Sequence, residues 1–417
     1  MNTHYCNRRA NCRLCGSESL TEVFKLAATP PANAFVQQAS LDDVQPTFPL
    51  DIFFCENCAH VQLLDVVDPS LLFENYVYVS GTSPIFIKHF KDYAEKICAD
   101  FPAQQGSLAI DIGSNDGTLL NFFQQNGYKV LGVDPAREIA RQATKDGVET
   151  WPDFFTPDLA RKILSERGPA SVVTANNMFA HADDLGGILV GIHSLLDIEG
   201  IFAFEVSYLL DVYCDTLFDT IYHEHLSYHS IKPLQTFMAT HGMRLIDVQR
   251  VNTHGGSLRC IACRSEANHI VKQSVEEGIQ NEARVNLHSS QTFKSYAGQV
   301  DQLRDELGAL IQNLKSEGKS IAAYGAPAKA TTLMYHFGLG PDVIDFIVDD
   351  SPLKQGLFSP GMHIPVLPST AIAERKPDYL LILAWNFAAP IIRNNASFFN
   401  TGGKFIIPVP QVEIVSS

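Results

Sequence analysis

The sequence predicts an α/β protein built from three parts, and three observations support this. Two Cys-x-x-Cys pairs lie within the first sixty residues. Near residue 110, and again near residue 322, an apolar segment of strand type runs into a glycine-containing turn and the start of a helix. Strands that alternate with helices form parallel sheets covered by helices. We therefore expect a small cysteine-rich domain followed by two α/β domains.

The composition is that of a folded, acidic protein. With 417 residues, the chain has room for two or three domains of about 150 residues each. Its 46 acidic and 31 basic residues give a net charge of -15, which argues against a nucleic-acid partner because phosphate backbones attract basic surfaces. No apolar run has the length of a signal-peptide core at the N-terminus or of a membrane span elsewhere. The sequence thus predicts a cytoplasmic protein with neither a nucleic-acid nor a membrane partner.

Four of the nine cysteines have the spacing of a zinc site. They form two pairs with 39 residues between them, and are Cys12, Cys15, Cys55 and Cys58. Four thiolates at this spacing bind zinc tetrahedrally and leave no ligand position for water, so we expect one structural Zn²⁺. Redox-active or merely buried cysteine pairs are the alternative. A third pair, Cys260 and Cys263, lies in a segment that alternates like a strand, so its side chains should face opposite ways and serve packing.

A glycine-containing turn follows the apolar segment at residues 107–112. Asp111 lies near the end of this strand, and Gly113 and Gly117 occupy the turn before the next helix. The turn lacks the third glycine of the dinucleotide-binding fingerprint and carries Asp116. Carboxylates in the turn would repel a pyrophosphate, but they can accept hydrogen bonds from the ammonium group of an amino acid. S-adenosylmethionine has such a group, so it fits this turn better than NAD.

Residues at the following strand ends complete the expected cofactor site. Asp134 ends the second strand, 17 residues after Gly117, where a carboxylate can bind both ribose hydroxyls. Phe154 follows the third strand and could cover adenine, although an aromatic side chain that only closes the core is the alternative. The fourth strand ends where the methyl donor would lie. The expected cofactor-binding residues are Asp111, Gly113, Asn115, Gly117, Asp134, Pro135, Phe154, Asn176 and Asn177.

Proton-handling side chains are concentrated in the segment from Tyr222 to His229. Imidazole, phenol and carboxylate groups together suit the removal of a proton from a carbon beside a ketone. If the segment is helical, Tyr222 and His225 lie together on one face and Glu224 points elsewhere. A zinc hydrolase motif would need His at the position of Ser227, so that alternative fails. A catalytic metal held by two histidines, an O- or N-methyltransferase, and a non-enzymatic scaffold stay open at this point.

The C-terminal part predicts a second nucleotide-type fold. Residues 267–317 are polar, with helical stretches that have apolar side chains at intervals of three and four. From residue 320 a strand, a tight turn and a helix follow one another. Gly325 and the turn that ends at Lys329 offer helix-start amides and a cation for a nucleotide diphosphate. An ordinary turn between a strand and a helix is the alternative.

Taken in order, these motifs resemble a known family. The sequence is similar to the zinc-containing nucleotide-sugar C-methyltransferases, which methylate deoxy-4-ketohexoses on the carbon beside the ketone. The resemblance extends over essentially the whole chain, and the order of the motifs is more specific than any single one. The motifs are CRLC, CENC, PANAF, DIGSNDG, NNMFAHADD, FDTIYHEHLSYHS, HGGSLR and AAYGAPAKATT.

The resemblance implies a domain organisation and a reaction. The expected domains are a zinc-binding domain at 1–70, a methyltransferase domain at 71–266, a helical connector at 267–317 and a Rossmann-like nucleotide-sugar domain at 318–417. The implied reaction is S-adenosylmethionine-dependent methylation, at C-3, of a 4-keto-deoxyhexose linked to a nucleotide. The family usually carries dTDP, with CDP and GDP as alternatives. The chain could act as a monomer or a small homo-oligomer.

The resemblance also implies roles for individual side chains. We expect His225 to remove the proton, because imidazole accepts protons near neutral pH. Tyr222 and Glu224 would position the sugar or stabilise the enolate, and His181 or Tyr76 would contact the sugar from the opposite wall. The remaining expected substrate-binding residues are Tyr78, Tyr208, Gly325 and Lys329.

Overall fold

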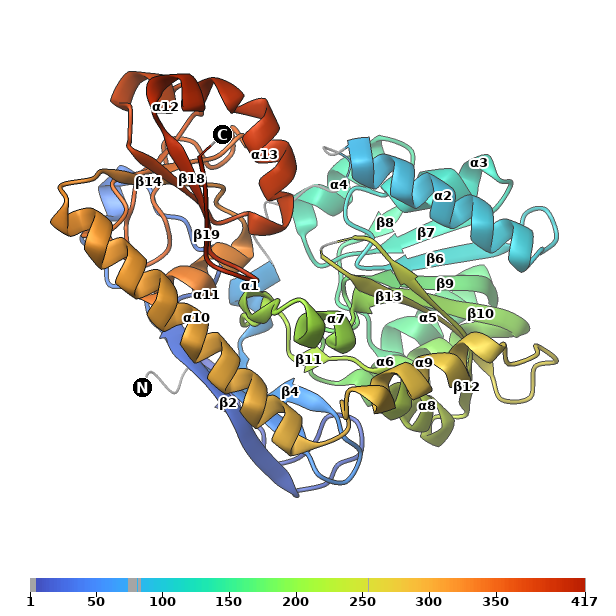
Figure 1. Cartoon of the computed structure of the whole chain (residues 1–417). Coiled ribbons are helices and arrows are strands. Elements are labelled where there is room, and N and C mark those ends of the chain that lie inside the picture. The colour runs from blue at the N-terminus through green and yellow to red at the C-terminus, as the bar shows by residue number, and fades with distance from the viewer. Residues whose placement is uncertain (1–4, 74–80, 82–83, 254, 417) are drawn as a thin grey trace.

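The computed structural model describes residues 5–73, 81, 84–253 and 255–416 of the chain. Three sheet-based domains follow one another, which confirms the predicted fold class. Figure 1 shows the middle and C-terminal domains side by side, with the N-terminal strands beside the long helix α10 (Ser290–Ser316). Each helix in the described part of the chain is too short or too polar to span a bilayer.

The N-terminal domain is an antiparallel sheet that takes one strand from the middle of the chain. Its strands have the order β11-β4-β3-β2, and a separate short pair joins β1 to β5. The elements are β1 (Cys6–Arg8), β2 (Leu20–Thr29), η1 (Gln38–Ser40), β3 (Phe48–Cys55), β4 (Val61–Leu63), β5 (Asp65–Val67), α1 (Pro69–Phe73) and β11 (Ser227–Tyr228). Ser227 pairs with Gln62 of β4. The segment directly after the candidate acid/base residues is therefore part of the N-terminal sheet.

The middle domain is a seven-stranded sheet of order β12-β13-β10-β9-β6-β7-β8. The strands from β10 to β8 are parallel, and β13 runs antiparallel to both β10 and β12. The strands are β6 (Leu108–Ile112), β7 (Lys129–Val133), β8 (Thr150–Trp151), β9 (Ala170–Asn176), β10 (Leu196–Ser207), β12 (Met243–Val251) and β13 (Ser257–Arg264). Because β6, β7, β8, β9 and β10 are parallel, their carboxyl ends meet at one edge of the sheet.

Helices cover both faces of this sheet. They include α2 (Pro84–Asp100), α3 (Thr118–Gln125), α4 (Arg137–Lys145), α5 (Pro157–Arg167), α6 (Leu185–Leu195) and α8 (Ile231–Thr240). Two shorter helices, α7 (Leu209–Cys214) and η3 (Phe218–Thr220), follow β10 in the chain. Alternate side chains of each strand enter two separate cores. Phe202 and Phe204 of β10 belong to one core, and Ile201 belongs to the other. Cys260 and Cys263 likewise lie in different cores, as their alternation in the sequence predicts.

The C-terminal domain is a six-stranded sheet of order β16-β15-β14-β17-β18-β19, parallel except for β19. Its elements are β14 (Ile321–Tyr324), α11 (Ala328–Phe337), β15 (Ile347–Val348), β16 (Val366–Leu367), α12 (Ala371–Arg375), β17 (Tyr379–Ile382), η4 (Trp385–Phe387), α13 (Ala388–Asn394), η5 (Ala396–Thr401), β18 (Lys404–Ile407) and β19 (Glu413–Val415). The strand order reverses between β14 and β17. In open α/β sheets, ligands bind beyond the carboxyl ends of the strands at such a switch point.

Two sequence-based expectations about helices have different outcomes. The polar segment before the C-terminal domain forms α9 (Gln273–Arg284) and α10, as its periodicity predicts. The segment from Tyr222 to His229 is not a helix. A turn, closed by a hydrogen bond from the amide of His225 to the carbonyl oxygen of Tyr222 at 2.8 Å, leads into β11. Pairing of β11 with β4 outweighs the local helical spacing, because the strand extends a buried sheet.

Candidate active site

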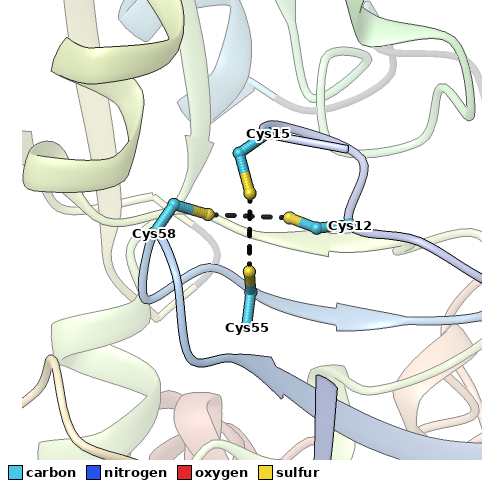
Figure 2. Close-up of side chains that lie close together, drawn as sticks. All are labelled: Cys12, Cys15, Cys55 and Cys58. Carbon is cyan, nitrogen blue, oxygen red and sulfur yellow. Dashed lines mark hydrogen bonds between the residues drawn. The ribbon is translucent and has the colours of Figure 1, made fainter. Parts of the chain in front are cut away.

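The four predicted cysteines come together in a metal centre (Figure 2). Their Sγ atoms all lie within 4.8 Å of one another. The Sγ atoms of Cys12 and Cys58 are 3.6 Å apart, and those of Cys15 and Cys55 are 3.5 Å apart. Sulfurs bound at about 2.3 Å from a tetrahedral zinc ion would be separated by about 3.8 Å. The geometry therefore fits one Zn²⁺ with a closed shell of four thiolates, which is a structural site.

A cavity of about 810 Å³ lies where the domains meet. Its volume is in the upper part of the range of about 300–1,000 Å³ that is common for small-molecule sites. The loops after the parallel strands of the middle domain form one wall, and the loops after β14, β15 and β17 form another. The N-terminal domain contributes Asn33 and Phe73. One cavity is thus shared by all three domains.

The glycine turn after β6 is compact, and its glycines are required. Gly113 has φ of +75°, and a Cβ atom there would lie 3.0 Å from the side chain of Met178. Gly117 has φ of +76°, and a Cβ atom there would lie 2.8 Å from Val148. Gly113 lines the cavity, whereas Gly117 supports the turn from behind and begins α3. The turn leaves space for the amino-acid end of a cofactor beside β6.

Asp134 fixes this turn from the end of β7. Its Oδ2 accepts a hydrogen bond from the amide of Asn115 at 2.8 Å, and its Oδ1 accepts one from the amide of Ala136 at 2.9 Å. Each carboxylate oxygen has a second lone pair, with which it could bind a ribose hydroxyl. Burial raises the pKa of Asp134. Asn115, Asp134 and Pro135 all line the cavity, as does Phe154, which is 40% exposed.

Asp111 is a buried carboxyl group on the cavity wall. Its Oδ1 accepts a hydrogen bond from Oγ1 of Thr174 at 2.7 Å. Burial raises the pKa of Asp111 to about 7, and the negative charge of Asp134 adds to this effect. A cation, such as the ammonium group of a bound amino acid, would stabilise the ionised form. Asn176 and Asn177 line the cavity beside it, at the end of β9.

Tyr222 and His225 face each other across the turn, with ring centroids 4.1 Å apart. Nδ1 of His225 lies 2.7 Å from the carbonyl oxygen of Thr220, which can only accept a hydrogen bond, so Nδ1 carries the proton. Nε2 of His225 then accepts from the hydroxyl of Tyr222 at 3.0 Å. The ring of His181 lies 5.0 Å from that of His225. All four residues line the cavity, so the expected acid/base cluster is assembled there.

Glu224, His223 and His229 do not line the cavity and lie behind this cluster. Oε1 of Glu224 accepts a hydrogen bond from Nδ2 of Asn33 at 2.8 Å, and Asn33 lines the cavity. Nε2 of His223 lies 3.1 Å from the carbonyl oxygen of Phe48. His229 is fully buried, and its ring is stacked 5.6 Å from that of Phe179. Because this segment is a turn followed by a strand, His225 and His229 do not share a helix face, which the expected metal-binding pair at i and i+4 requires.

Two of the expected substrate residues, Tyr208 and Gly325, do not line the cavity. Tyr208 is buried in the core, where its hydroxyl donates to Oε1 of Glu282 at 3.0 Å, and it does not line the cavity. Gly325 also lies outside the cavity lining; a Cβ atom there would be 2.6 Å from that of Ala384, so glycine permits close contact between two loops. Tyr76 and Tyr78 lie outside the described residues.

Lys329 lines the cavity at the start of α11, but it also pairs with a buried acid. Its Nζ lies 3.4 Å from Oδ2 of Asp219 and 4.3 Å from the ring centroid of Trp385. A second lysine, Lys354, lines the same wall and donates to the carbonyl oxygen of Ala326 at 2.7 Å. Two ammonium groups thus lie near the switch point of an acidic protein.

Sequence reasoning missed several residues of this site. Asn33 and Asp183 lie within motifs that carry the family resemblance, PANAF and NNMFAHADD, but nothing local singles them out. Lys354 and Phe387 follow no motif, because only the folding of the C-terminal sheet brings their loops to the cavity. The missed cavity-lining residues include Asn33, Phe73, Asp183, Ser351, Leu353, Lys354, Asn386 and Phe387.

Comparisons with known proteins agree with this organisation. Residues 12–73 match a family described as a zinc binding domain, residues 87–248 match a methyltransferase domain, and residues 252–410 match a C-methyltransferase C-terminal domain. The C-methyltransferase NovU of Streptomyces niveus is 36% identical over 406 residues, which cover 97% of each chain.

Two solved methyltransferase structures overlap with part of the chain. Magnesium protoporphyrin IX methyltransferase from Synechocystis PCC 6803 covers 43% of this chain and 79% of its own, with 15% identity and a TM-score of 0.33. The CcbJ methyltransferase from Streptomyces caelestis covers 42% of this chain and 89% of its own, with 14% identity and a TM-score of 0.34. The full-length match and the three matched domains decide the family. The chain belongs to the S-adenosylmethionine-dependent C-methyltransferases that have an N-terminal zinc-binding domain.

Proposed function

We propose that this enzyme transfers the methyl group of S-adenosylmethionine to C-3 of a nucleotide-linked 4-keto-deoxyhexose, in the biosynthesis of a branched-chain deoxysugar. The proposed domains are a zinc-binding domain at 1–70, a methyltransferase domain at 71–266, a helical connector at 267–317 and a nucleotide-sugar domain at 318–417. C-methylation requires an acceptor with a carbon that can be activated as a nucleophile.

One observation carries this proposal: a single cavity contains a cofactor wall, an acid/base cluster and a nucleotide-type switch point. The cofactor wall is formed by Asp111, Asp134 and their neighbours. Tyr222 and His225 lie on the same cavity, and so does Lys329 at the start of α11. A methyl donor, a ketone and an anionic handle could therefore be bound together. An O- or N-methyltransferase has less need for such a cluster, because its acceptor atom is already nucleophilic.

The arrangement of His225 supports its role as the base. The carbonyl oxygen of Thr220 holds the proton on Nδ1, so Nε2 is basic and directed at Tyr222. We infer that Nε2 takes the proton from the carbon beside the ketone, and that Tyr222 or His181 donates a hydrogen bond to the enolate oxygen. S-adenosylmethionine, when bound, supplies an electrophilic methyl group. The new C–C bond forms as the methyl–sulfur bond breaks, the ketone is restored, and His225 releases its proton to solvent.

The C-terminal wall supports a diphosphate-linked substrate. Lys329 and Lys354 lie on it, and Pro327 and Ala328 place the N-terminal end of α11 at the cavity. Amide groups at the start of a helix and lysine side chains both stabilise phosphate oxygens. We propose dTDP as the nucleotide, with CDP and GDP as the alternatives to be tested.

Mass spectrometry of the product tests the proposal. Protein is incubated in deuterated water with S-adenosylmethionine and 4-keto-deoxysugars linked to dTDP, CDP or GDP. With the methyl donor, we expect the mass of one methylene group to be added to one sugar. When S-adenosylhomocysteine replaces the methyl donor, we expect deuterium to enter at the carbon beside the ketone. His225→Ala should abolish both signals, whereas His269→Gln, which changes a histidine bonded to the carbonyl oxygen of Glu199, should retain both. Binding of the cofactor without methylation of any sugar would refute the proposed substrate class.

A further inference from the structure

The segment from Cys12 to Cys15, called the zinc knuckle below, contains a buried arginine. Arg13 lies between Cys12 and Cys15, and its side chain is 0% exposed. The two arginines that precede it in the sequence are different, since the side chains of Arg8 and Arg9 are 46% and 25% exposed. A zinc ion held by four cysteines requires no arginine, so the burial of this charge needs another explanation.

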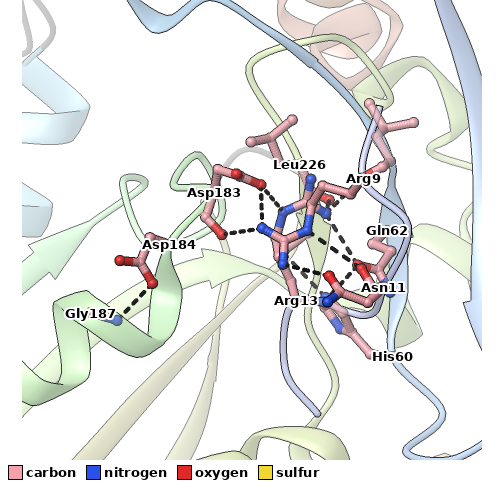
Figure 3. A network of polar contacts seen from close by, with 11 residues as sticks. Arg9, Asn11, Arg13, His60, Gln62, Asp183, Asp184, Gly187 and Leu226 are labelled. Atoms are coloured by element: carbon pink, nitrogen blue, oxygen red, sulfur yellow. Dashed lines mark hydrogen bonds and ion pairs between the residues drawn. The ribbon is translucent and has the colours of Figure 1, made fainter. Parts of the chain in front are cut away.

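Arg13 makes hydrogen bonds to three other segments of the chain (Figure 3). Its Nε donates to Oδ1 of Asp183 at 3.0 Å. Its Nη1 lies 2.6 Å from the carbonyl oxygen of Leu63, 3.1 Å from that of Leu226 and 3.2 Å from Oε1 of Gln62. The backbone amide of Arg13 donates to the same Gln62 oxygen at 3.0 Å. The planar guanidinium therefore joins the zinc knuckle to two loops of the middle domain, one at Asp183 and one at Leu226.

Both of these loops belong to the site. Asp183 lines the cavity after the end of β9. Leu226 directly follows His225, and its amide donates to the carbonyl oxygen of Ala180 at 2.9 Å. Leu226 also accepts, at its carbonyl oxygen, from the amide of Leu63 at 3.0 Å. Two backbone hydrogen bonds and one from the side chain of Arg13 thus hold Leu226, the residue next to His225.

We propose that Arg13 is a positioning residue. Through it, the zinc knuckle fixes the cavity wall at Asp183 relative to residues 222–228, the base loop, which carries His225. The part that concerns His225 rests on the proposed function. A fork of donors in one plane can bind an acid and a carbonyl oxygen at once, and lysine offers only a point charge. Zinc would then affect catalysis without touching any reactant, since it fixes the loop from which Arg13 projects.

Four variants separate this role from simple support of the metal site. Arg13→Met removes every side-chain donor, and Arg13→Lys retains the charge without the fork. Arg9→Met removes a second donor to Asp183, at 3.0 Å, without affecting Leu226. Arg8→Met is the matched control, because Arg8 pairs with Asp65 at 3.1 Å in the same domain and away from the cavity. Each variant is checked for zinc content and thermal unfolding before the functional measurements.

Two measurements do not depend on the identity of the sugar. Hydrogen–deuterium exchange of the peptide that covers 222–228 reports on the base loop, and calorimetric titration with S-adenosylhomocysteine reports on the cofactor wall. For Arg13→Lys with a full zinc content, we expect faster exchange and an affinity reduced roughly tenfold. Arg9→Met should weaken cofactor binding without faster exchange of that peptide. With an accepted substrate, Arg13→Lys should lower kcat by about 100-fold, because small displacements of catalytic groups have effects of that size.

The outcomes are decisive. Zinc-loaded Arg13→Lys with wild-type exchange, affinity and kcat would overturn the proposal, even if Arg13→Met loses zinc or fails to fold. Faster exchange and weaker cofactor binding in zinc-loaded Arg13→Lys, with wild-type behaviour of Arg8→Met, would support it. If no sugar is methylated by the wild-type protein, the proposed function fails, but exchange and cofactor affinity still test the role of Arg13.

Discussion

The indole nitrogen of Trp385 donates a hydrogen bond to Oδ2 of Asp219 at 2.7 Å, and this bond joins the C-terminal domain to the segment just before the acid/base turn. Asp219 is completely buried, and Lys329 lies 3.4 Å from the same oxygen. Oγ1 of Thr332, one turn further along α11, donates to the carbonyl oxygen of Ile221 at 2.7 Å. The C-terminal domain thus holds the backbone that leads to the acid/base turn, independently of any ligand that this domain binds.

Asp219→Asn should destabilise the protein by about 3 kcal/mol, because it leaves the ammonium group of Lys329 without its buried counter-charge. Urea unfolding measures this change. The double variant Asp219→Asn with Lys329→Met should recover much of the stability, since both charges are gone, but it should not recover methyl transfer. Equal stability of the single variant and the wild type would show that the pair does not hold the two domains together.

Tyr222→Phe should lower kcat by roughly 100-fold or more, the usual scale of a lost acid/base group. The ring can still pack 4.1 Å from that of His225, but the hydroxyl bonded to Nε2 is gone. Methyl transfer at saturating cofactor measures the effect. Tyr228→Phe is the control, since Tyr228 is buried in β11 and does not line the cavity. A Tyr222→Phe enzyme with wild-type kcat would remove Tyr222 from the mechanism.

Asp111→Asn should stabilise the cofactor-free protein at alkaline pH. Burial raises the pKa of Asp111 to about 7 in the folded state, whereas an unfolded aspartate has a pKa of about 3.9. The folded state therefore retains a proton that the unfolded state releases. The resulting contribution to stability is fully present below about pH 4 and is lost as pH rises through 7.

The asparagine variant avoids this loss. Its free energy of unfolding should exceed that of the wild type by on the order of 3 kcal/mol at pH 8, and by less at pH 5. Urea titrations at the two pH values measure the difference, with the exposed Asp146→Asn as control. Binding of S-adenosylhomocysteine should become weaker in Asp111→Asn, because its ammonium group loses a carboxylate partner. A stability difference that does not depend on pH would contradict the raised pKa.

Removal of zinc should unfold the N-terminal domain. Structural zinc sites contribute directly to folding, so Cys12→Ser or treatment with a strong chelator should lower the midpoint of thermal unfolding and abolish methyl transfer. Elemental analysis should find one zinc per chain in the wild type and less in Cys12→Ser. Cys214→Ser, which changes an exposed cysteine outside the cluster, should retain the metal. A zinc-free protein with unchanged thermal stability would argue against a structural role.

Local sequence predicted those parts of the site whose geometry depends on short spacings. The four cysteines, the glycine turn and Asp134 follow such spacings, and the structure brings each set together. Tyr222 and His225 are neighbours as expected, although a turn rather than a helix joins them. That difference arises because β11 is fixed by its partner β4, which lies far away in the sequence.

The remaining features depend on contacts between domains, which no local pattern encodes. The burial of Arg13 and the pairing of Asp219 with Trp385 exist only when separate segments have folded against each other. Tyr208 follows a strand end, a position that predicts a cavity residue, but α9 provides Glu282 as a buried partner for its hydroxyl. More of the residues expected to bind the cofactor than of those expected to bind the substrate therefore line the cavity.

The cavity with three walls limits how such enzymes can be recombined. A chimera that takes its C-terminal domain from a relative, in order to accept another nucleotide, would replace Trp385 and Thr332 while retaining Asp219 and Ile221. Asp219 and Ile221 would then lose the side chains to which they are hydrogen-bonded in this protein. Productive exchanges should move residues 218–222 together with the C-terminal domain, so that the boundary for recombination follows the contact and not the linker.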